Sequence, residues 1–184
     1  MITIVYDVKV YRRLLSETVR EGDVVLEIGP HTGESTLQYA EKTGKVIVVD
    51  KAFQSKKAFS ALMKRYPNLV FIEGDARGFE AVKEVLKHTK SCDVFSLDMG
   101  GGRYADTVFK VWATWSGIFK PRDSIIRCRS LAEFIKRTKI VDPSLKQSFP
   151  DNGWLATWGR ETPYKLRKQL EEFKYWINIK KPLD

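Results

Sequence analysis

The chain has 184 residues, of which 43% are hydrophobic, which is enough for one well-buried core and short for two. No apolar run approaches the roughly 20 residues that a membrane-spanning helix needs, and the N-terminus lacks the apolar core of a signal peptide. We therefore expect residues 1–184 to form a single soluble domain in the cytoplasm, without a membrane partner. Cys92 and Cys128 lie in apolar runs without a C-x-x-C partner, so we expect buried free thiols.

The net charge of +9 is concentrated in the last third of the chain. Residues 1–119 carry 17 Lys and Arg against 15 Asp and Glu, whereas residues 120–184 carry 15 against 8. The same region holds Trp154, Trp158 and Trp176. A basic surface interleaved with aromatic side chains suits a nucleic acid or another polyanion. A solvated Lys-rich surface above ordinary core tryptophans would give the same composition, so both interpretations stay open.

The hydrophobic pattern predicts helices and strands in alternation. Within residues 1–22, a leading helix is expected at 7–20. Strands are expected at 23–28, 45–50, 69–73, 93–97 and 124–128. Further helices are expected to begin near 32–36 and to cover about 54–66, 79–86 and 105–119. Five strands alternating with helices indicate an α/β fold, a doubly wound, mostly parallel sheet with helices on both faces.

The last segment, 131–184, is the least regular. We expect a short helix at 131–137, a strand beginning at 140–141, a polar loop at 142–153, a strand at 154–158 and a helix opening at 162–163. Residues 175–181 fit either a last strand or the tail of that helix.

The turn after the first of these strands carries the most specific pattern. An apolar run ends in Glu27-Ile28-Gly29-Pro30-His31-Thr32-Gly33. Gly29 permits a turn that other residues resist, and Gly33 lets a ligand or a neighbouring backbone come close. The dinucleotide fingerprint G-x-G-x-x-G is absent, and a turn of this kind alone also occurs in ordinary βα units.

Acidic residues close four of the expected strands: Glu27, Asp50, Asp75 and Asp98. In an open α/β sheet these strand ends meet at the crevice that binds ligands. The Glu27 to Gly33 turn resembles motif I of the class I (Rossmann-like) S-adenosylmethionine-dependent methyltransferases, with His31 where many relatives carry a third glycine. Lys120-Pro121-Arg122-Asp123 resembles the turn that often precedes strand 5 in this family.

The resemblance implies roles for these residues. Asp50 corresponds to the carboxylate that takes both ribose hydroxyls, Asp75 to the acidic residue that meets the adenine amino group, and Asp98 to the motif IV position beside the transferable methyl group. S-adenosylmethionine is a sulfonium cation without a pyrophosphate, so acidic strand ends suit it. The implied cofactor contacts are Glu27, Gly29, His31, Gly33, Asp50, Lys51, Asp75, Ala76 and Asp98.

The implied reaction is an in-line displacement, with Asp98 and Tyr104 as candidate catalytic residues. Asp98 would equally serve as a helix cap or a cofactor contact without a proton role. Gly100–Gly102 is either a flexible linker or a wall thin enough for a substrate to approach. We expect substrate contacts from Arg103 and, in the C-terminal segment, from Arg160 and Lys165, although a solvated helix face explains the last two as well.

The methyl acceptor is not fixed by the sequence. The Asn/Asp-Pro-Pro-Tyr/Phe motif of amino-group methyltransferases is missing after Asp98, which counts against exocyclic base amines. Cys128-Arg129-Ser130 stands where metal-dependent relatives carry an Asp-Asn pair, so no metal site is implied. Three hypotheses remain: an RNA methyltransferase, a small-molecule methyltransferase, and a relative that binds the cofactor without turnover. The oligomeric state is open.

Overall fold

One six-stranded sheet organises the chain, in a computed structural model that describes residues 1–144 and 151–155. The strands are β1 (Ile2–Val5), β2 (Val24–Ile28), β3 (Lys45–Asp50), β4 (Leu69–Glu73), β5 (Val94–Asp98) and β6 (Asp123–Arg127). Their order is β1-β6-β5-β2-β3-β4, and every neighbouring pair is parallel. The order reverses between β2 and β5, which is the point where doubly wound sheets open a crevice for ligands.

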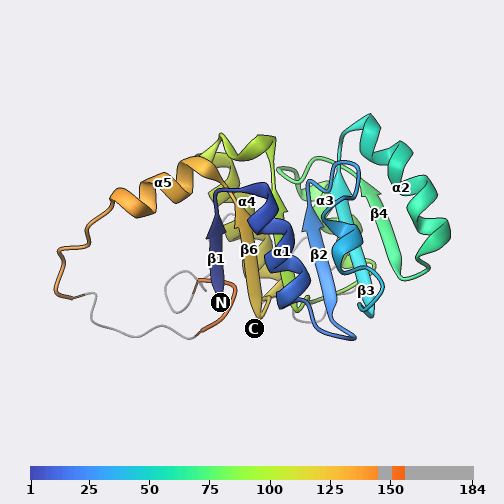
Figure 1. The fold of residues 1–184 in the computed structure, drawn as a ribbon, viewed down its shortest axis with the longest axis horizontal. Helices are drawn as coiled ribbons and strands as arrows, with labels where there is room; N and C mark the ends of the chain where they lie inside the picture. The colour runs from blue at the N-terminus through green and yellow to red at the C-terminus, as the bar shows by residue number, and fades with distance from the viewer. Residues whose placement is uncertain (145–150, 156–184) are drawn as a thin grey trace.

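Helices cover both faces of the sheet, as the alternating pattern predicts (Figure 1). The helices are α1 (Val8–Thr18), α2 (Phe53–Arg65), α3 (Phe79–Leu86), α4 (Ala105–Phe119) and α5 (Arg129–Arg137), with 3₁₀ turns η1 (Thr36–Gln38) and η2 (Gly100–Gly102). α1 and α2 enclose one buried core, and α3 and α4 enclose the other. α5 projects from the side of the sheet and buries none of its residues (Figure 1).

The two cores follow from the alternation of side chains along each strand. On β2, Leu26 and Ile28 pack with α3 and α4, whereas Val25 packs with α1 and α2. Glu27 lies on the same face as Val25, beneath α1 and η1, where Thr36 and Tyr39 contact it. Its carboxylate is therefore held inside a core and not at the open edge of the sheet.

Three expectations are wrong. The helix expected near 32–36 is only the 3₁₀ turn η1, because the chain must return to β3 at Lys45 within a few residues. β1, which the sequence pattern missed, pairs with β6 from Ile2 opposite Ser124 to Val5 opposite Arg127. No strand forms at 140–141.

The remaining bounds agree with the expected ones to within a residue or two. The leading helix is confirmed, and the Asp7 carboxylate caps it by accepting hydrogen bonds from the backbone N–H groups of Lys9 and Val10. Cys92 and Cys128 are buried free thiols, as expected. Within the part of the chain that the structure describes, no helix is long and apolar enough to cross a membrane.

The described residues 151–155 lie at the N-terminal end of β6. The N–H of Gly153 donates to the carbonyl of Pro121, and a Cβ atom at Gly153 would lie 2.6 Å from the Asp123 carbonyl carbon. Residues 154–155 form no strand, and the rest of the strand expected at 154–158, like the helix expected from 162, lies outside the described residues. This contact is made at the start of β6, opposite the strand ends that carry the carboxylates.

Candidate functional site

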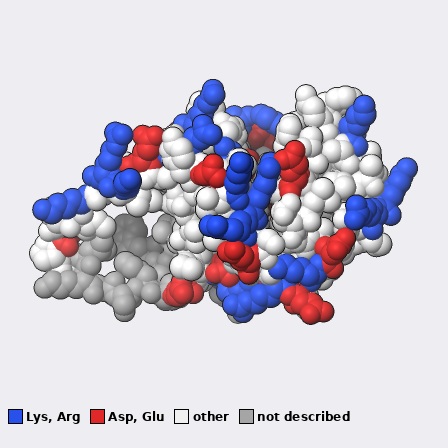
Figure 2. All heavy atoms as spheres, viewed as in Figure 1, with Lys and Arg blue, Asp and Glu red and all other residues white. Residues whose placement is uncertain are grey.

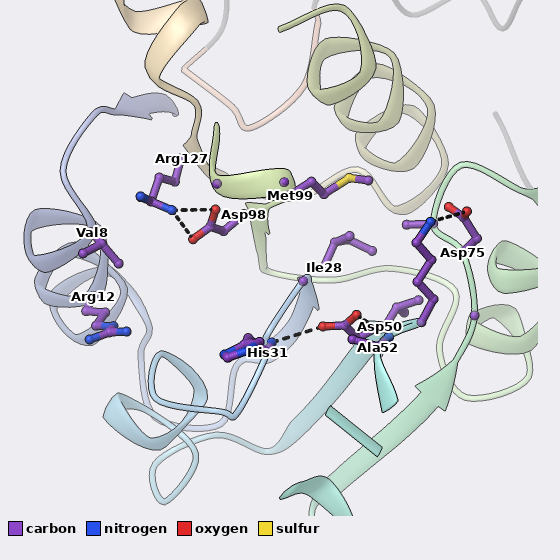
Figure 3. Close-up of a pocket in the computed structure, with 17 residues that line it drawn as sticks. Val8, Arg12, Ile28, His31, Asp50, Ala52, Asp75, Asp98, Met99 and Arg127 are labelled. Atoms are coloured by element: carbon purple, nitrogen blue, oxygen red, sulfur yellow. Dashed lines mark hydrogen bonds and ion pairs between the residues drawn. The ribbon is translucent and has the colours of Figure 1, made fainter. Parts of the chain in front are cut away.

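A cavity of about 430 Å³ opens at the C-terminal ends of the central strands (Figure 3). Residues from α1, from five strands or from the loops after those strands line it, among them Arg12, Gly29, Asp50, Asp75, Asp98 and Arg127. Its size falls in the range of about 300–1,000 Å³ that small-molecule sites occupy. Three of the four predicted strand-end carboxylates therefore share one cavity.

Gly29 is required by the approach of two loops. It adopts a positive φ of 78°, and a Cβ atom there would lie 2.0 Å from the backbone oxygen of Asp98. Gly33 also has a positive φ, of 86°, but its added Cβ would meet the Leu62 side chain of α2 at 2.7 Å. Gly29 thus lets β2 and β5 close the floor of the cavity, whereas Gly33 serves the packing of α2.

His31 stands in the left-handed conformation that glycine usually supplies, with φ 52°. Its backbone N–H donates to Asp50 Oδ2 at 3.1 Å, and this contact orders the loop above β2 (Figure 3). Asp50 also accepts from the Ala52 N–H at 2.9 Å and from Ser55 Oγ at 2.7 Å. Asp50 therefore joins the loop after β2 to the start of α2, and it also lines the cavity.

Asp75 is held between two cations. Arg77 donates through its guanidinium and its backbone N–H, and Lys51 Nζ donates at 3.1 Å. The Arg77 guanidinium, together with Lys51, holds the pKa of Asp75 well below its usual range, although partial burial acts in the other direction. Asp75 is thus ionised across the physiological range, and Lys51 and Ala76 border the cavity on either side of it.

Asp98 faces a buried arginine across the neighbouring strand. The two residues pair in register at the ends of β5 and β6, and Arg127 Nη1 donates to both carboxylate oxygens, at 2.9 and 2.8 Å (Figure 3). Burial raises the pKa of Asp98 above its ordinary value, and Arg127 counteracts that rise. The pair leaves Asp98 at the cavity wall beside Met99 and Gly100.

Glu27 does not reach the cavity. The side chain is 1% exposed, and its Oε2 accepts hydrogen bonds from Thr36 Oγ1 and the Tyr39 hydroxyl, both at 2.6 Å. Burial raises its pKa from 4.5 to about 7, although the two hydroxyl groups oppose the rise. The expectation that all four strand-end carboxylates face the crevice is therefore wrong for Glu27, because strand alternation turns it toward α1.

Tyr104 lies beside the main cavity, not in it. It is 62% exposed and lines a second hollow of about 290 Å³, which shares Lys51, Met99 and Gly100 with the first. Arg103 is exposed next to it, at the end of the Gly100–Gly102 turn. Arg160 and Lys165, the other expected substrate contacts, lie outside the described residues.

Sequence reasoning missed two charged residues of the cavity, Arg12 and Arg127 (Figure 3). Arg12 comes from α1 and pairs with Glu34. Arg127 is 8% exposed, which is rare for an arginine without a function or a partner. The sequence placed Arg127 within the strand expected at 124–128 but gave no sign that it would lie opposite Asp98.

Comparison with known proteins shows similarity at the level of structure. No protein-family model matches the sequence, and no curated protein matches it. A dimethyladenosine transferase from Plasmodium falciparum superposes with a TM-score of 0.51 at 21% identity, over 73% of this chain and 46% of that one. An rRNA methylase from Streptococcus thermophilus gives 0.50 at 13% identity, over 71% and 78%. The 23S rRNA methyltransferase ErmE gives 0.48 at 18% identity, over 74% and 51%.

The dimethyladenosine transferase and the Streptococcus thermophilus methylase share the fold of this chain. The chain spans about half the length of ErmE and of the dimethyladenosine transferase, and it shares few identical residues with either. The parallel order and the strand-end cavity match the pattern that the sequence predicted. The chain has the fold of the class I S-adenosylmethionine-dependent methyltransferases.

Proposed function

We propose that the cavity binds S-adenosylmethionine and that the chain transfers its methyl group to an acceptor of the RNA class. The observation that carries this proposal is the placement of Asp50, Asp75 and Asp98 around one cavity whose floor requires Gly29. A cationic ligand with a ribose and an exocyclic amine fits that donor set, because carboxylates accept hydrogen bonds from hydroxyl and amino groups and attract positive charge.

Asp50 is suited to hold the ribose diol. A carboxylate offers about four acceptor positions, and three of those on Asp50 are taken by His31, Ala52 and Ser55. Its Oδ1 keeps one position, and the Ser55 hydroxyl can rotate to free another. Lys51 and Arg77 fix Asp75 at the other end of the cavity, where it would accept from the adenine amino group.

Asp98 borders the part of the cavity where the methyl group would lie. When bound, S-adenosylmethionine would supply an activated methyl group, which passes to the nucleophile while the sulfonium sulfur leaves as a neutral thioether. Asp98 would accept a hydrogen bond from a hydroxyl group of the acceptor and orient it, while Arg127 keeps the carboxylate in place. Gly100–Gly102 forms a wall without side chains on this side, so an acceptor can come close.

RNA is proposed as the acceptor for two reasons. The basic excess of the chain lies in residues 120–184, and Lys and Arg side chains gather over α1 and along α5 (Figure 2). One of the superposing structures is an rRNA methylase, of which this chain covers 78%. The second hollow, bordered by Tyr104, favours a small-molecule acceptor instead, since it adjoins the main cavity and is large enough for a compact ligand.

Tritiated S-adenosylmethionine distinguishes the two acceptor classes. The purified chain is incubated with it and either total RNA or a small-molecule extract. The proposal predicts label in high-molecular-weight material that ribonuclease releases, and little label with Asp98→Asn. Label confined to the small-molecule fraction would favour a small-molecule acceptor. No label in either fraction would contradict methyl transfer to RNA and to small molecules alike.

A further inference from the structure

The side of the cavity next to β1 and β6 differs in charge from the side next to β3 and β4. Asp50 and Asp75 lie on one side, whereas Arg12 and Arg127 lie on the other, with Asp98 beside Arg127 (Figure 3). Arg129, the first residue of α5, follows two residues after Arg127. Burial raises the pKa of Asp98, and the positive charges of Arg127, Arg12 and Arg129 act to lower it.

Two of these arginines keep buried donors without an acceptor. Within residues 1–144 and 151–155, three buried side-chain nitrogen or oxygen atoms lack a hydrogen-bond partner, and Arg12 Nε and Arg127 Nε are two of them. Both residues line the cavity. A buried donor without a partner costs free energy, and a water, an ion or a ligand that supplies the missing acceptor would remove this cost. Unpartnered guanidinium edges are suited to phosphate oxygens, which their planar geometry matches.

An exposed aromatic ring stands next to Arg129. Tyr6, in the turn between β1 and α1, is 52% exposed, and the Arg129 guanidinium lies 5.5 Å from its ring centroid. Bases of single-stranded RNA stack on such tyrosine rings and on arginine planes. Phosphate donors and a stacking ring therefore occur together on the acceptor side of Asp98.

We propose that Arg12, Arg127 and Arg129 bind the backbone phosphate of a single-stranded RNA acceptor, with Tyr6 as the platform for a neighbouring base. This inference rests on the proposed function, because it assigns the acceptor half of the same site. It places the RNA across the β1 and β6 side of the cavity, between α1 and the start of α5. The target nucleotide then enters past Asp98.

The test uses the full chain saturated with S-adenosylhomocysteine and a fluorescein-labelled single-stranded RNA of about 12 nucleotides, within the usual site size. Fluorescence anisotropy is read at several salt concentrations between about 50 and 200 mM. The test variants are Arg12→Gln and Arg129→Gln. Each has a matched control on the same helix, Arg13→Gln on α1 and Arg137→Gln on α5, whose side chains are exposed and paired with Glu17 and Glu133.

Each test variant is expected to weaken RNA binding about tenfold, because it removes a charge-assisted contact. The slope of log K against log salt should also fall by about 0.7 for each lost phosphate contact. The controls should stay within about twofold of the wild type, since a diffuse charge effect is all they remove. Equal losses in test and control variants would overturn the proposal.

The carboxylate of the cofactor is the competing occupant for the same donors. Titration of Arg12→Gln with S-adenosylhomocysteine and with 5′-methylthioadenosine, which lacks the amino-acid tail, separates the two. Unchanged affinity for both supports an RNA phosphate, whereas selective loss of S-adenosylhomocysteine binding assigns the arginine to the cofactor and overturns the proposal. Wild-type protein that binds S-adenosylhomocysteine but no RNA would refute this inference alone. Absence of S-adenosylhomocysteine binding would refute the proposed function itself.

Discussion

Replacing Glu27 by glutamine should stabilise the protein at neutral and alkaline pH. The carboxylate is buried, and its pKa rises from 4.5 to about 7, so the folded protein holds this proton more tightly than the unfolded chain. Below pH 4.5 both states are protonated. Between pH 4.5 and 7 only the unfolded chain releases the proton, and the free energy of unfolding falls as pH rises. At about 1.4 kcal/mol for each factor of ten in proton affinity, the total loss is about 3 kcal/mol.

Glutamine removes this penalty and keeps the local contacts. Thr36 and Tyr39 both donate to a single oxygen of Glu27, and the amide oxygen of glutamine can accept both hydrogen bonds. We expect wild type and Glu27→Gln to be similar in stability below pH 4.5, and the variant to be more stable by about 3 kcal/mol above pH 7.

Urea unfolding below pH 4.5 and above pH 7 measures the free energy of unfolding of both proteins. The difference between the two values isolates Glu27, because all other groups titrate in both proteins. The exposed Glu73→Gln, which removes the same charge from the end of β4, is the control and should show no such trend. Parallel curves of stability against pH for wild type and Glu27→Gln would refute the reasoning. They would mean that burial does not alter the titration of Glu27.

Two further substitutions test the floor and the wall of the cavity. Gly29→Ala should lower the free energy of unfolding, measured with urea, by at least about 2 kcal/mol, because the new Cβ would lie 2.0 Å from the Asp98 carbonyl oxygen and residue 29 has a positive φ. The control is Gly117→Ala, at a helical position with open space around it, which should be neutral or stabilising. Equal effects would contradict the close approach. Arg127→Met should cost about 2–3 kcal/mol by leaving the largely buried Asp98 carboxylate without its partner. The double variant Arg127→Met/Asp98→Leu should recover part of that loss, and an additive result would show that the two residues do not interact.

The sequence predicts the central strands well and the edges of the fold poorly. β3 and β4 match their expected bounds because unbroken apolar runs closed by a carboxylate leave little choice of structure. β1 is a β-branched run of only four residues, and its partner β6 lies more than 100 residues away, so the local pattern allows a strand but does not show its pairing. The 3₁₀ turn η1 depends on where β3 begins, which limits the room for a helix after Gly33.

In the candidate site, the sequence predicts the residues that depend on the order of elements and misses those that depend on strand register or on the face of a strand. The carboxylates Asp50, Asp75 and Asp98 were found because parallel strands bring their ends together, a rule that needs only the order of elements. The same rule failed for Glu27, because the side chain's face on the strand decides whether it reaches the crevice. Arg127 could not be assigned from spacing alone, since its importance depends on its register with Asp98.

The most direct test of the proposed methyl-donor site is titration calorimetry of the full chain with S-adenosylhomocysteine, with NADH as the control ligand. Asp50→Ala is compared with Glu73→Gln, whose residue is paired with Asp50 in register but lies outside the cavity lining. We predict micromolar binding to wild type and Glu73→Gln, at least tenfold weaker binding to Asp50→Ala, and no binding of NADH. Equal affinity in both variants, or no binding to the wild type, would contradict the assignment of the strand-end carboxylates to the cofactor.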